Sequence, residues 1–481
     1  MVSTTAAEIG RLDATAQAEL VHRGEATPAE LVEWAIERVE AVNPQLNAVV
    51  VPMYEHARKA VAEAAGPLAG VPMVWKDLVV EIPGIPFHEG SRFLRDNVST
   101  FESELAVRAR RAGLVAVGRT NSPEFGMAPT CQPILHGPTR NPWDLDRSTS
   151  GSSGGSSAAV AAGLVPVGHA NDAGGSIRYP ASACGLFGLK PTRARVPLGP
   201  EYGDALGGLA IEHAVTRSVR DSAAVLDAIA GPMLGDPYPA PPVARPFAAE
   251  VGAPTGRLRI AYSPRTPEGT EGHPHCVAAL EDAVRLLEDL GHDVVEVDFS
   301  LITPRAGAAM GTLMNASTAW IVGYWERLLG RTADPDQLEP ATRVLLEAGR
   351  TVSAEALLLA ITDLQAFSRT VAEFLTPFDA WVTPTMSTPP ARIDELVADE
   401  SDPMGPMARA GATVRYSGVI ANITGNPAMS VPLGTSPDGL PIGIHFLGRF
   451  GDEAGLLRLA SQLEEARPWA DRWPPINAVG R

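Results

Sequence analysis

The chain has 481 residues, and 45% of them are hydrophobic, which is enough to build a sizeable core. Its formal net charge is −17, from 56 acidic and 39 basic residues, so nucleic acids and anionic membranes are not expected as partners. The three cysteines, Cys131, Cys184 and Cys276, are odd in number and lack the paired spacing of zinc ligands, which argues against a disulfide framework. The sequence shows no signal-peptide pattern and no run of membrane-spanning length, so we expect a cytoplasmic protein.

Helix and strand signals alternate along the chain. A helix is expected to begin after Thr27, because Thr27 and Glu30 form a capping box around Pro28 in the first turn. The run Gly70–Val80 is strand-like and holds Lys76 among apolar residues. Further helices are predicted over 101–111, 156–162, 218–230, 276–290 and 456–463, and further strands over 114–117, 164–167, 258–262, 294–297, 378–383, 429–433 and 442–447.

Two longer segments differ from this alternation. Residues 305–376 are predicted to be mostly helical, and residues 235–256 are rich in proline and alanine, which predicts a surface excursion. Because strands and helices alternate elsewhere, we expect an α/β fold with one large mixed β-sheet sandwiched between helices. No internal repeat divides the chain, and we expect residues 1–481 to form a single domain.

The stretch Ser148–Pro191 carries the strongest chemical signal. Two Gly/Ser clusters, Ser150–Ser157 and Gly174–Ser176, flank a small-residue helix and a short apolar run. Such clusters are often flexible linkers, but a linker does not usually run straight into core sequence. Serines held by glycines place hydroxyls on tight turns, where backbone N–H groups can approach a ligand closely. We therefore interpret the stretch as a candidate active site.

The motifs of this stretch resemble those of the amidase signature family of serine hydrolases. The matching segments are Gly151–Ser156, Asp172–Arg178 and Cys184–Thr192, together with an upstream lysine motif at Gly70–Asp77. The resemblance covers most of the chain and implies the amidase signature fold, with a signature core over about 70–232 and a helical lid or pocket segment over about 305–376. Ser150 replaces a glycine common in the family, and His169-Ala170-Asn171 is similar to the nylon-oligomer branch.

The resemblance also implies the role of each site residue. Ser176 would be the nucleophile, Ser152 a bridging serine in a cis peptide, and Lys76 the general base. An isolated lysine more often packs its stem and extends its ammonium to water. Burial among apolar neighbours would instead lower the pKa of Lys76 and leave a neutral amine able to accept a proton. The remaining implied residues are the oxyanion-hole amides of Ala173, Gly174, Gly175 and Ser176, the supporting residues Ser153, Asp172 and Arg178, and the acyl-pocket walls Met127 and Cys131.

The expected activity is hydrolysis of a small, fairly apolar carboxylic amide through an acyl-enzyme, with esters and carbamates as further substrates. The resemblance implies no metal and no cofactor, and homodimers are common among such enzymes, although no residue indicates one here. Two alternatives stay open: an amidotransferase subunit that acts on charged tRNA, and a non-catalytic binding protein. Gly151–Gly155 also fits the G-x-S-x-G nucleophile elbow, but the apolar strand that this motif requires does not precede it. His273-Pro274-His275-Cys276 lacks the second ligand cluster of a metal site.

Overall fold

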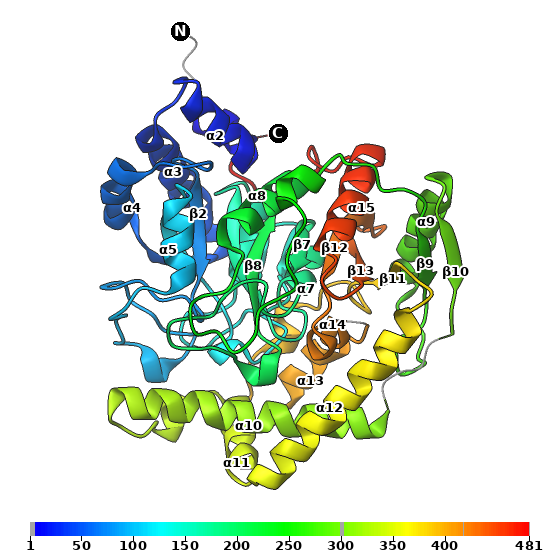
Figure 1. Ribbon diagram of the computed structural model, residues 1–481. Helices are drawn as coiled ribbons and strands as arrows, with labels where there is room; N and C mark the ends of the chain where they lie inside the picture. Colours follow the sequence, from blue (N-terminus) through cyan, green and yellow to red (C-terminus); the bar gives the residue numbers. More distant parts are fainter. Residues whose placement is uncertain (1–4, 299–302, 417, 481) are drawn as a thin grey trace.

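The computed structural model describes residues 5–298, 303–416 and 418–480. In these residues eleven strands form one sheet that runs through the molecule, in the order β1-β3-β2-β6-β8-β7-β12-β13-β11-β9-β10 (Figure 1). Parallel and antiparallel pairs are mixed: β2 is parallel to both β3 and β6, whereas β6 and β8 are antiparallel. The expected α/β class with a large mixed sheet is confirmed. No helix in the described ranges is long and apolar enough to cross a membrane.

The strands are short, and most are buried along their whole length. The sheet consists of β1 (Val49–Pro52), β2 (Pro72–Lys76), β3 (Val115–Thr120), β6 (Val167–Asp172), β7 (Phe187–Lys190), β8 (Ile211–Thr216), β9 (Arg259–Tyr262), β10 (Asp293–Glu296), β11 (Ala380–Pro384), β12 (Ala428–Thr435) and β13 (Pro441–Gly448). A separate pair is formed by β4 (Arg140–Asn141) and β5 (Asp144–Ser148).

Helices cover both faces of the sheet. They are α1 (Ala6–Gly10), α2 (Ala14–His22), α3 (Pro28–Leu46), α4 (Tyr54–Ala60), α5 (Glu104–Arg111), α6 (Gly154–Ala161), α7 (Arg178–Cys184), α8 (Val219–Ile229), α9 (Pro274–Asp289), α10 (Pro304–Leu329), α11 (Pro340–Arg350), α12 (Ala354–Leu375), α13 (Gly405–Ala412), α14 (Gly418–Thr424) and α15 (Glu453–Ala466). On one face of the sheet, strand residues form a hydrophobic cluster with residues of α5, α8, α9 and α15. On the opposite face, strand residues form a second cluster with residues of α3, α6 and α7.

Most predicted elements are present with small shifts at their ends. The capping box of Thr27 and Glu30 opens α3 as expected, with Pro28 in its first turn. The strand predicted over 164–167 is misplaced, because β6 begins only at Val167 and continues to Asp172. Leu164 and Val165 are buried but follow Gly163, whose φ of +72° turns the chain out of α6. This shift matters because it places the polar end of the motif on a central strand.

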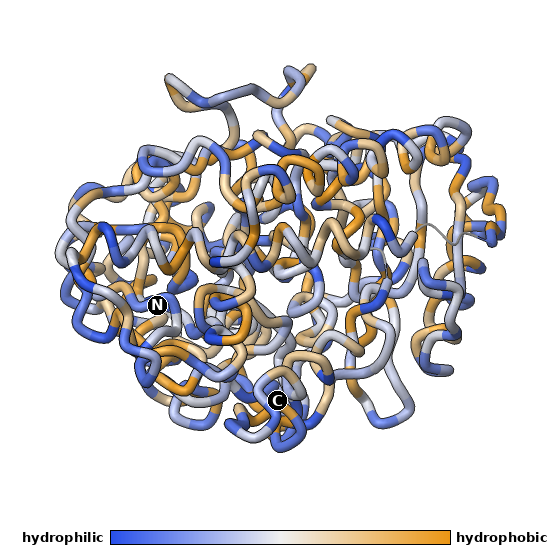
Figure 2. Tube along the Cα trace, turned by 90° about the horizontal axis from the view of Figure 1, so that it is seen from below, coloured by the Kyte–Doolittle hydropathy of each residue, from blue (hydrophilic) through white to orange (hydrophobic). Residues whose placement is uncertain are grey.

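The predicted helical segment 305–376 forms α10, α11 and α12, which we call the lid. These helices lie along the lower side of the molecule, below the ends of the strands (Figure 1). Seen from below, hydrophobic and hydrophilic residues alternate along the coils on this side, which is the pattern of helices with one apolar face (Figure 2). The apolar face of the lid packs against the sheet: Leu313, Leu364 and Phe367 of the lid form one hydrophobic cluster with Trp381 and Leu447 of the strands.

The carboxyl groups of buried Glu124 and half-buried Glu339 join the lid to the body. The backbone N–H of Glu339, before α11, donates to Glu124 Oε2 at 2.8 Å, and Glu339 Oε1 accepts from the N–H of Ile134 at 2.7 Å. Burial raises the pKa of both carboxyl groups, and the neighbouring Glu124 raises that of Glu339 further. At neutral pH this contact therefore favours a protonated carboxyl group.

We expect the variant Glu339→Gln to be more thermostable than wild type at pH 8 but not at pH 5. Between the ordinary carboxyl pKa and the raised folded value, the folded state holds a proton that the unfolded chain has released, so wild-type stability falls as pH rises. Glutamine removes this dependence at one group. Melting temperatures across pH test it, with exposed Glu347→Gln on α11 as the control. Parallel pH curves for wild type and Glu339→Gln would contradict it.

Candidate active site

Lys76 is the last residue of β2, between β3 and β6 in the sheet, and it is fully buried. Its Nζ donates to Ser152 Oγ at 2.6 Å and to Asn171 Oδ1 at 2.5 Å. Both acceptors are neutral, so no carboxylate is hydrogen-bonded to the lysine to hold its charge. The amine therefore lies where water cannot solvate it, as its apolar neighbours in the sequence predict.

Burial lowers the pKa of Lys76 to about 7, against the opposing field of Glu212, Asp172 and more distant groups. A large fraction of the amine is thus unprotonated at neutral pH. A neutral amine with one hydrogen bond to a serine hydroxyl can accept a proton from that hydroxyl.

Ser152 lies on a loop that packs closely against the backbone of neighbouring segments. The Gly151–Ser152 peptide is cis, and a Cβ on Gly151 would lie 2.3 Å from the carbonyl oxygen of Thr130. A Cβ on Gly155, in the first turn of α6, would lie 2.6 Å from the backbone of Asn121. Only glycine permits these approaches, so the glycines of the motif fix the position from which the Ser152 hydroxyl reaches Lys76.

Ser176 lies on the turn between β6 and α7, beside the Ser152 loop. Its carbonyl oxygen accepts a hydrogen bond from the N–H of Ser153 at 3.3 Å. Its side chain is half-buried, and its hydroxyl makes no hydrogen bond to Ser152 or to any other described residue. A Cβ on the nearby Gly174 would meet nothing within 4 Å. The turn therefore faces open space on the side where a substrate could approach.

The predicted oxyanion-hole amides differ from one another in the structure. The N–H of Gly175 donates to Asp172 Oδ1 at 2.7 Å, and Gly175 has a φ of +125°. This amide is therefore engaged and does not point toward a substrate oxygen. In the described part of the chain, the amides of Ala173, Gly174 and Ser176 have no acceptor. These three donors are available to an oxyanion, and Gly175 instead ties the turn to Asp172.

Asp172 and Arg178 form a buried ion pair beneath this turn. Arg178 donates to both carboxylate oxygens at 3.0 and 2.9 Å, and the N–H of Ile177 donates to Asp172 Oδ2 at 3.1 Å. Asn422 also donates to Asp172 Oδ1 at 2.9 Å. Burial acts to raise the pKa of the Asp172 carboxyl, but the Arg178 guanidinium outweighs it and holds the pKa well below its usual range.

We expect Asp172→Asn to destabilise the fold by about 3–5 kcal/mol, because it leaves the buried Arg178 charge without its counter-ion. The wild-type contribution is present above the ordinary carboxyl pKa and is lost as pH falls toward the depressed folded value, so the difference between the proteins should shrink in acid. Urea unfolding at several pH values measures it. The control is Glu25→Gln, which breaks a solvent-exposed pair with Arg23 and should change stability far less. Equal losses in the two variants would contradict this interpretation.

Sequence reasoning missed the polar residues that support Lys76 from β6. Asn171 accepts from Lys76 Nζ, and the His169 ring accepts at Nδ1 from the Lys76 N–H at 3.3 Å. The His169 proton therefore lies on Nε2, which is 2.6 Å from Glu212 Oε2 on β8. His169 and Asn171 are two residues apart on β6, so their side chains lie on the same face of the strand. This spacing would have indicated that they act together if the strand had been predicted in the right place.

Met127 and Cys131 occupy different environments. Cys131 has no exposed surface; its Sγ donates to Thr139 Oγ1 at 3.5 Å, and its Cβ lies 2.7 Å from the position that a Cβ on Gly154 would take. It therefore packs behind the serine loop. Met127 is half-buried, and Thr318 on α10 lies 3.8 Å from its Sδ. Its role as a pocket wall stays a prediction.

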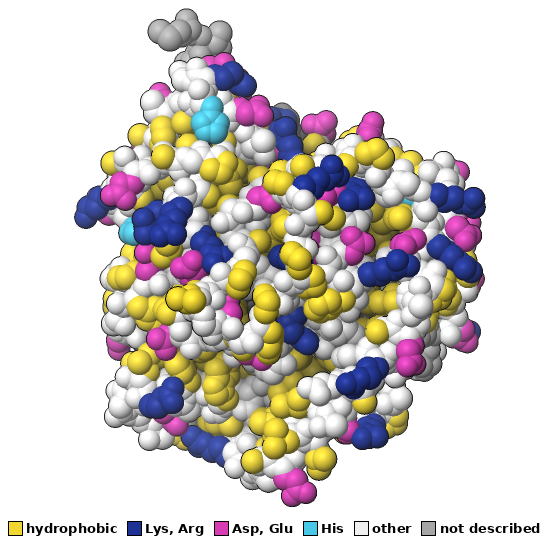
Figure 3. Space-filling model, in the orientation of Figure 1, with side chains coloured by type: hydrophobic (Ala, Val, Ile, Leu, Met, Phe, Trp, Pro, Cys, Tyr) yellow, Lys and Arg dark blue, Asp and Glu magenta, His cyan; other side chains and the backbone are white. Residues whose placement is uncertain are grey.

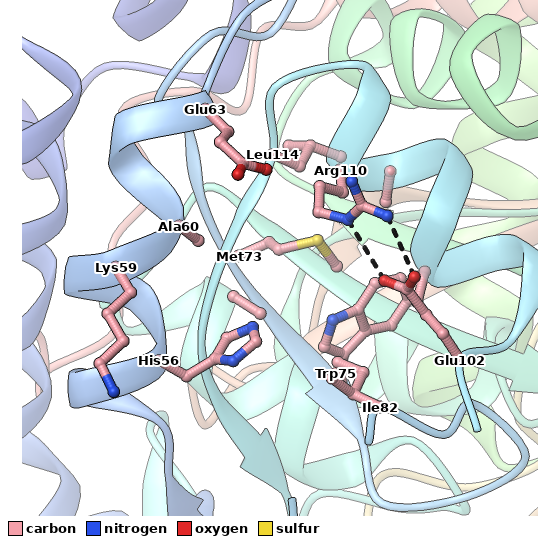
Figure 4. A pocket seen from close by; sticks show the side chains of 13 residues that line it. His56, Lys59, Ala60, Glu63, Met73, Trp75, Ile82, Glu102, Arg110 and Leu114 are labelled. Atoms are coloured by element: carbon pink, nitrogen blue, oxygen red, sulfur yellow. Dashed lines mark hydrogen bonds and ion pairs between the residues drawn. The ribbon is translucent and has the colours of Figure 1, made fainter. Parts of the chain in front are cut away.

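A cavity of about 240 Å³ lies behind β2, and Figure 4 shows its lining. Trp75 and Met73 point into it from the strand, and the ion pair of Glu102 and Arg110 lies at its edge. Because neighbouring strand residues point to opposite faces, Lys76 turns away from this cavity. The cavity is therefore separate from the candidate active site.

A second cavity, of about 530 Å³, lies between the lid and the body. Leu209, Leu313 and Leu364 line it, with Arg193 and Asp204 among its polar residues. These leucines belong to the hydrophobic cluster against which Ala173 packs, but Lys76, Ser152 and Ser176 do not line the cavity itself. Figure 3 shows apolar side chains gathering in the lower half of this face, where the lid meets the body.

Comparison with known proteins agrees with this geometry. The sequence profile described as amidase matches residues 30–457. The 6-aminohexanoate-cyclic-dimer hydrolase of Paenarthrobacter ureafaciens is 38% identical over 480 residues, covering 96% of each chain. A solved structure of 6-aminohexanoate cyclic dimer hydrolase complexed with substrate has a TM-score of 0.94 at 37% identity, covering 98% of this chain and 100% of that one. A bacterial aryl acylamidase has a TM-score of 0.86 at 26% identity, covering 99% of each chain. The chain therefore belongs to the amidase signature family of hydrolases, which act on amide bonds.

Proposed function

We propose that this protein hydrolyses a small, fairly apolar carboxylic amide through an acyl-enzyme, with Ser176, Ser152 and Lys76 as the catalytic residues. The observation that carries the proposal is the 2.6 Å hydrogen bond between the buried Lys76 amine and Ser152, beside the turn that holds Ser176. A serine hydroxyl is a weak nucleophile at its free pKa and needs a base to take its proton. Burial makes Lys76 such a base near neutral pH.

In the acylation step, Ser176 Oγ attacks the amide carbonyl carbon while its proton passes to Ser152 and the Ser152 proton passes to Lys76 Nζ. The carbonyl oxygen becomes an oxyanion, which the amides of Ala173, Gly174 and Ser176 stabilise. One such donor is typically worth about 3 kcal/mol of barrier. The C–N bond then breaks, and the proton returns through Ser152 to the leaving nitrogen, which departs as a neutral amine.

Deacylation follows the same proton route. Water attacks the Ser176 ester and gives a proton through Ser152 to Lys76. Collapse of the second tetrahedral intermediate releases the carboxylic acid, and the proton returns to Ser176 Oγ. The ester intermediate explains why esters and carbamates are also expected as substrates, because they form the same type of enzyme-bound carbonyl.

The substrate class is supported by the cavity beneath the lid and by the relatives. Leu209, Leu313 and Leu364 line the cavity beneath the lid, and an apolar acyl or amine group would fit against them. The relatives named above act, by their names, on a cyclic dimer of 6-aminohexanoate and on aryl acylamides. We propose that aliphatic, cyclic and aryl amides of this size are the substrates of this chain.

The test is to incubate the purified protein separately with four compounds: the cyclic 6-aminohexanoate dimer, an anilide, an aryl ester and an aryl carbamate. Release of the amine or alcohol is followed by chromatography. Added hydroxylamine should divert part of the product into a hydroxamate, because it competes with water for an acyl-enzyme. Turnover without any hydroxamate would remove the acyl-enzyme from the scheme. If the chain hydrolyses none of these compounds alone but does so with added partner subunits and charged tRNA, the amidotransferase alternative holds.

A further inference from the structure

Three potential metal ligands meet at the end of β2, next to the candidate active site but outside it. Asp77 directly follows Lys76, whereas His88 and His136 come from two separate loops. One ligand atom from each residue lies within 4.8 Å of the others. No step of the proposed hydrolysis uses any of these side chains.

The histidine nitrogens that meet here have no partners. His88 Nδ1 and His136 Nε2 are buried and make no hydrogen bond within the described residues. His88 Nδ1 lies 3.7 Å from Asp77 Oδ2, which is too long for a hydrogen bond, and the two imidazole rings are 5.3 Å apart. Buried polar atoms without partners are uncommon in folded proteins, and two that face the same carboxylate are consistent with a bound ion.

The donor set fits one class of ligand. Two imidazole nitrogens and one carboxylate oxygen are the ligands that divalent zinc, cobalt and iron take in protein sites with a position left open for water. We propose that Asp77, His88 and His136 bind a divalent first-row transition metal ion. With bonds of about 2.0–2.2 Å, tetrahedral ligand atoms lie roughly 3.4 Å apart, so the two loops would need to close by about 1 Å.

The groups around the site hold Asp77 in place but supply no excess of negative charge. Asp77 already accepts from the N–H of His88 at 3.2 Å, which fixes one loop to the carboxylate. The guanidinium of Arg119 is 4.0 Å from Asp77 Oδ1, and the positive charge of Arg95 interacts electrostatically with the His136 ring. The nearby carboxyl groups of Glu81 and Glu89 offset these cations only in part, because burial raises their pKa values to about 7 and about 8. The bound ion would join the two loops to the end of β2 and take no part in acyl transfer.

The experiment uses untagged full-length protein, stripped with a chelator and then titrated with cobalt(II). Wild type should bind one cobalt(II) per chain, with visible absorption typical of nitrogen and oxygen ligands, and its melting temperature should rise. His136→Gln and His88→Gln should each weaken binding at least tenfold, whereas His275→Gln should bind like wild type. His275 is a matched control because its ring lies 4.7 Å from that of His273 without an acidic third ligand in the described cluster.

A second measurement does not depend on the folding of any variant. Cobalt(II) should protect His88 and His136 of wild type from diethyl pyrocarbonate, with His275 as the internal reference in the mass spectrum. Absence of cobalt(II) binding, or binding that only His275→Gln removes, would overturn the proposal. Because binding is measured without substrate, its failure would leave the proposed hydrolysis untouched.

Discussion

Ser176→Ala is expected to lower kcat by about a millionfold while leaving the fold intact, since loss of a serine nucleophile has effects of that size in other hydrolases. The hydroxyl makes no hydrogen bond with the described residues, so its removal breaks no contact that stabilises the protein. Wild type should also form a covalent adduct with a fluorophosphonate probe on Ser176, located by peptide mass spectrometry. Ser176→Ala should form none.

The matched control is Ser157→Ala, five residues after Ser152 on α6. Ser157 is buried, and its Oγ has no hydrogen-bond partner in the described structure, so alanine should be tolerated there. This variant should keep both hydrolysis and probe labelling. An adduct on Ser152 or Ser153 in wild type, or normal turnover of Ser176→Ala, would show that the nucleophile has been misassigned.

Lys76→Met should lower kcat/KM by at least about a thousandfold, because the relay then lacks its proton acceptor. In wild type, kcat/KM should fall about tenfold per pH unit below pH 7, as protonation of Lys76 removes the base. Initial rates between pH 5 and 9 measure both effects. A wild-type profile that is flat between pH 5 and 8 would exclude Lys76 as the group that titrates.

The same variant should be more stable than wild type in weak acid. The folded pKa of Lys76 is depressed, so between about 7 and its ordinary value of 10.5 the unfolded chain binds the extra proton, and wild-type stability rises with pH in that window. Methionine removes this penalty, so the gain in melting temperature should be largest below pH 7. Lys190→Met is the control, since Lys190 is also fully buried, with a pKa lowered by burial, but lies outside the relay. Both variants should gain stability, and only Lys76→Met should lose activity.

The sequence indicates the residues of the relay because each occurs in a dense local motif. Gly151 to Gly155 and Gly174 to Ser176 are recognisable as segments whose glycines allow close backbone approach, and the structure shows such contacts at Gly151 and Gly155. The layered α/β architecture could also be predicted, because the alternation of strands and helices is regular.

The supporting contacts could not be predicted in the same way. Asn422 reaches Asp172 across 250 residues, and no local pattern marks it. Asn171 could not be assigned to Lys76 because the preceding strand was predicted too early, over 164–167. The engagement of Gly175 with Asp172 depends on one φ of +125°, which composition alone does not reveal. Long-range polar contacts are set by tertiary packing, and a single sequence carries little information about them.

The contacts of Asp172 and Arg178 with distant residues also bear on the order in which the candidate site is assembled. Arg178 contacts Asn422 on α14 at 2.7 Å and His445 on β13 at 2.8 Å, so the turn that carries Ser176 is held by segments 244 and 267 residues further along the chain. During synthesis the proposed nucleophile, Ser176, is made well before the residues that hold its turn. We therefore expect fragments that contain Ser176 but end before α14 to lack hydrolytic activity.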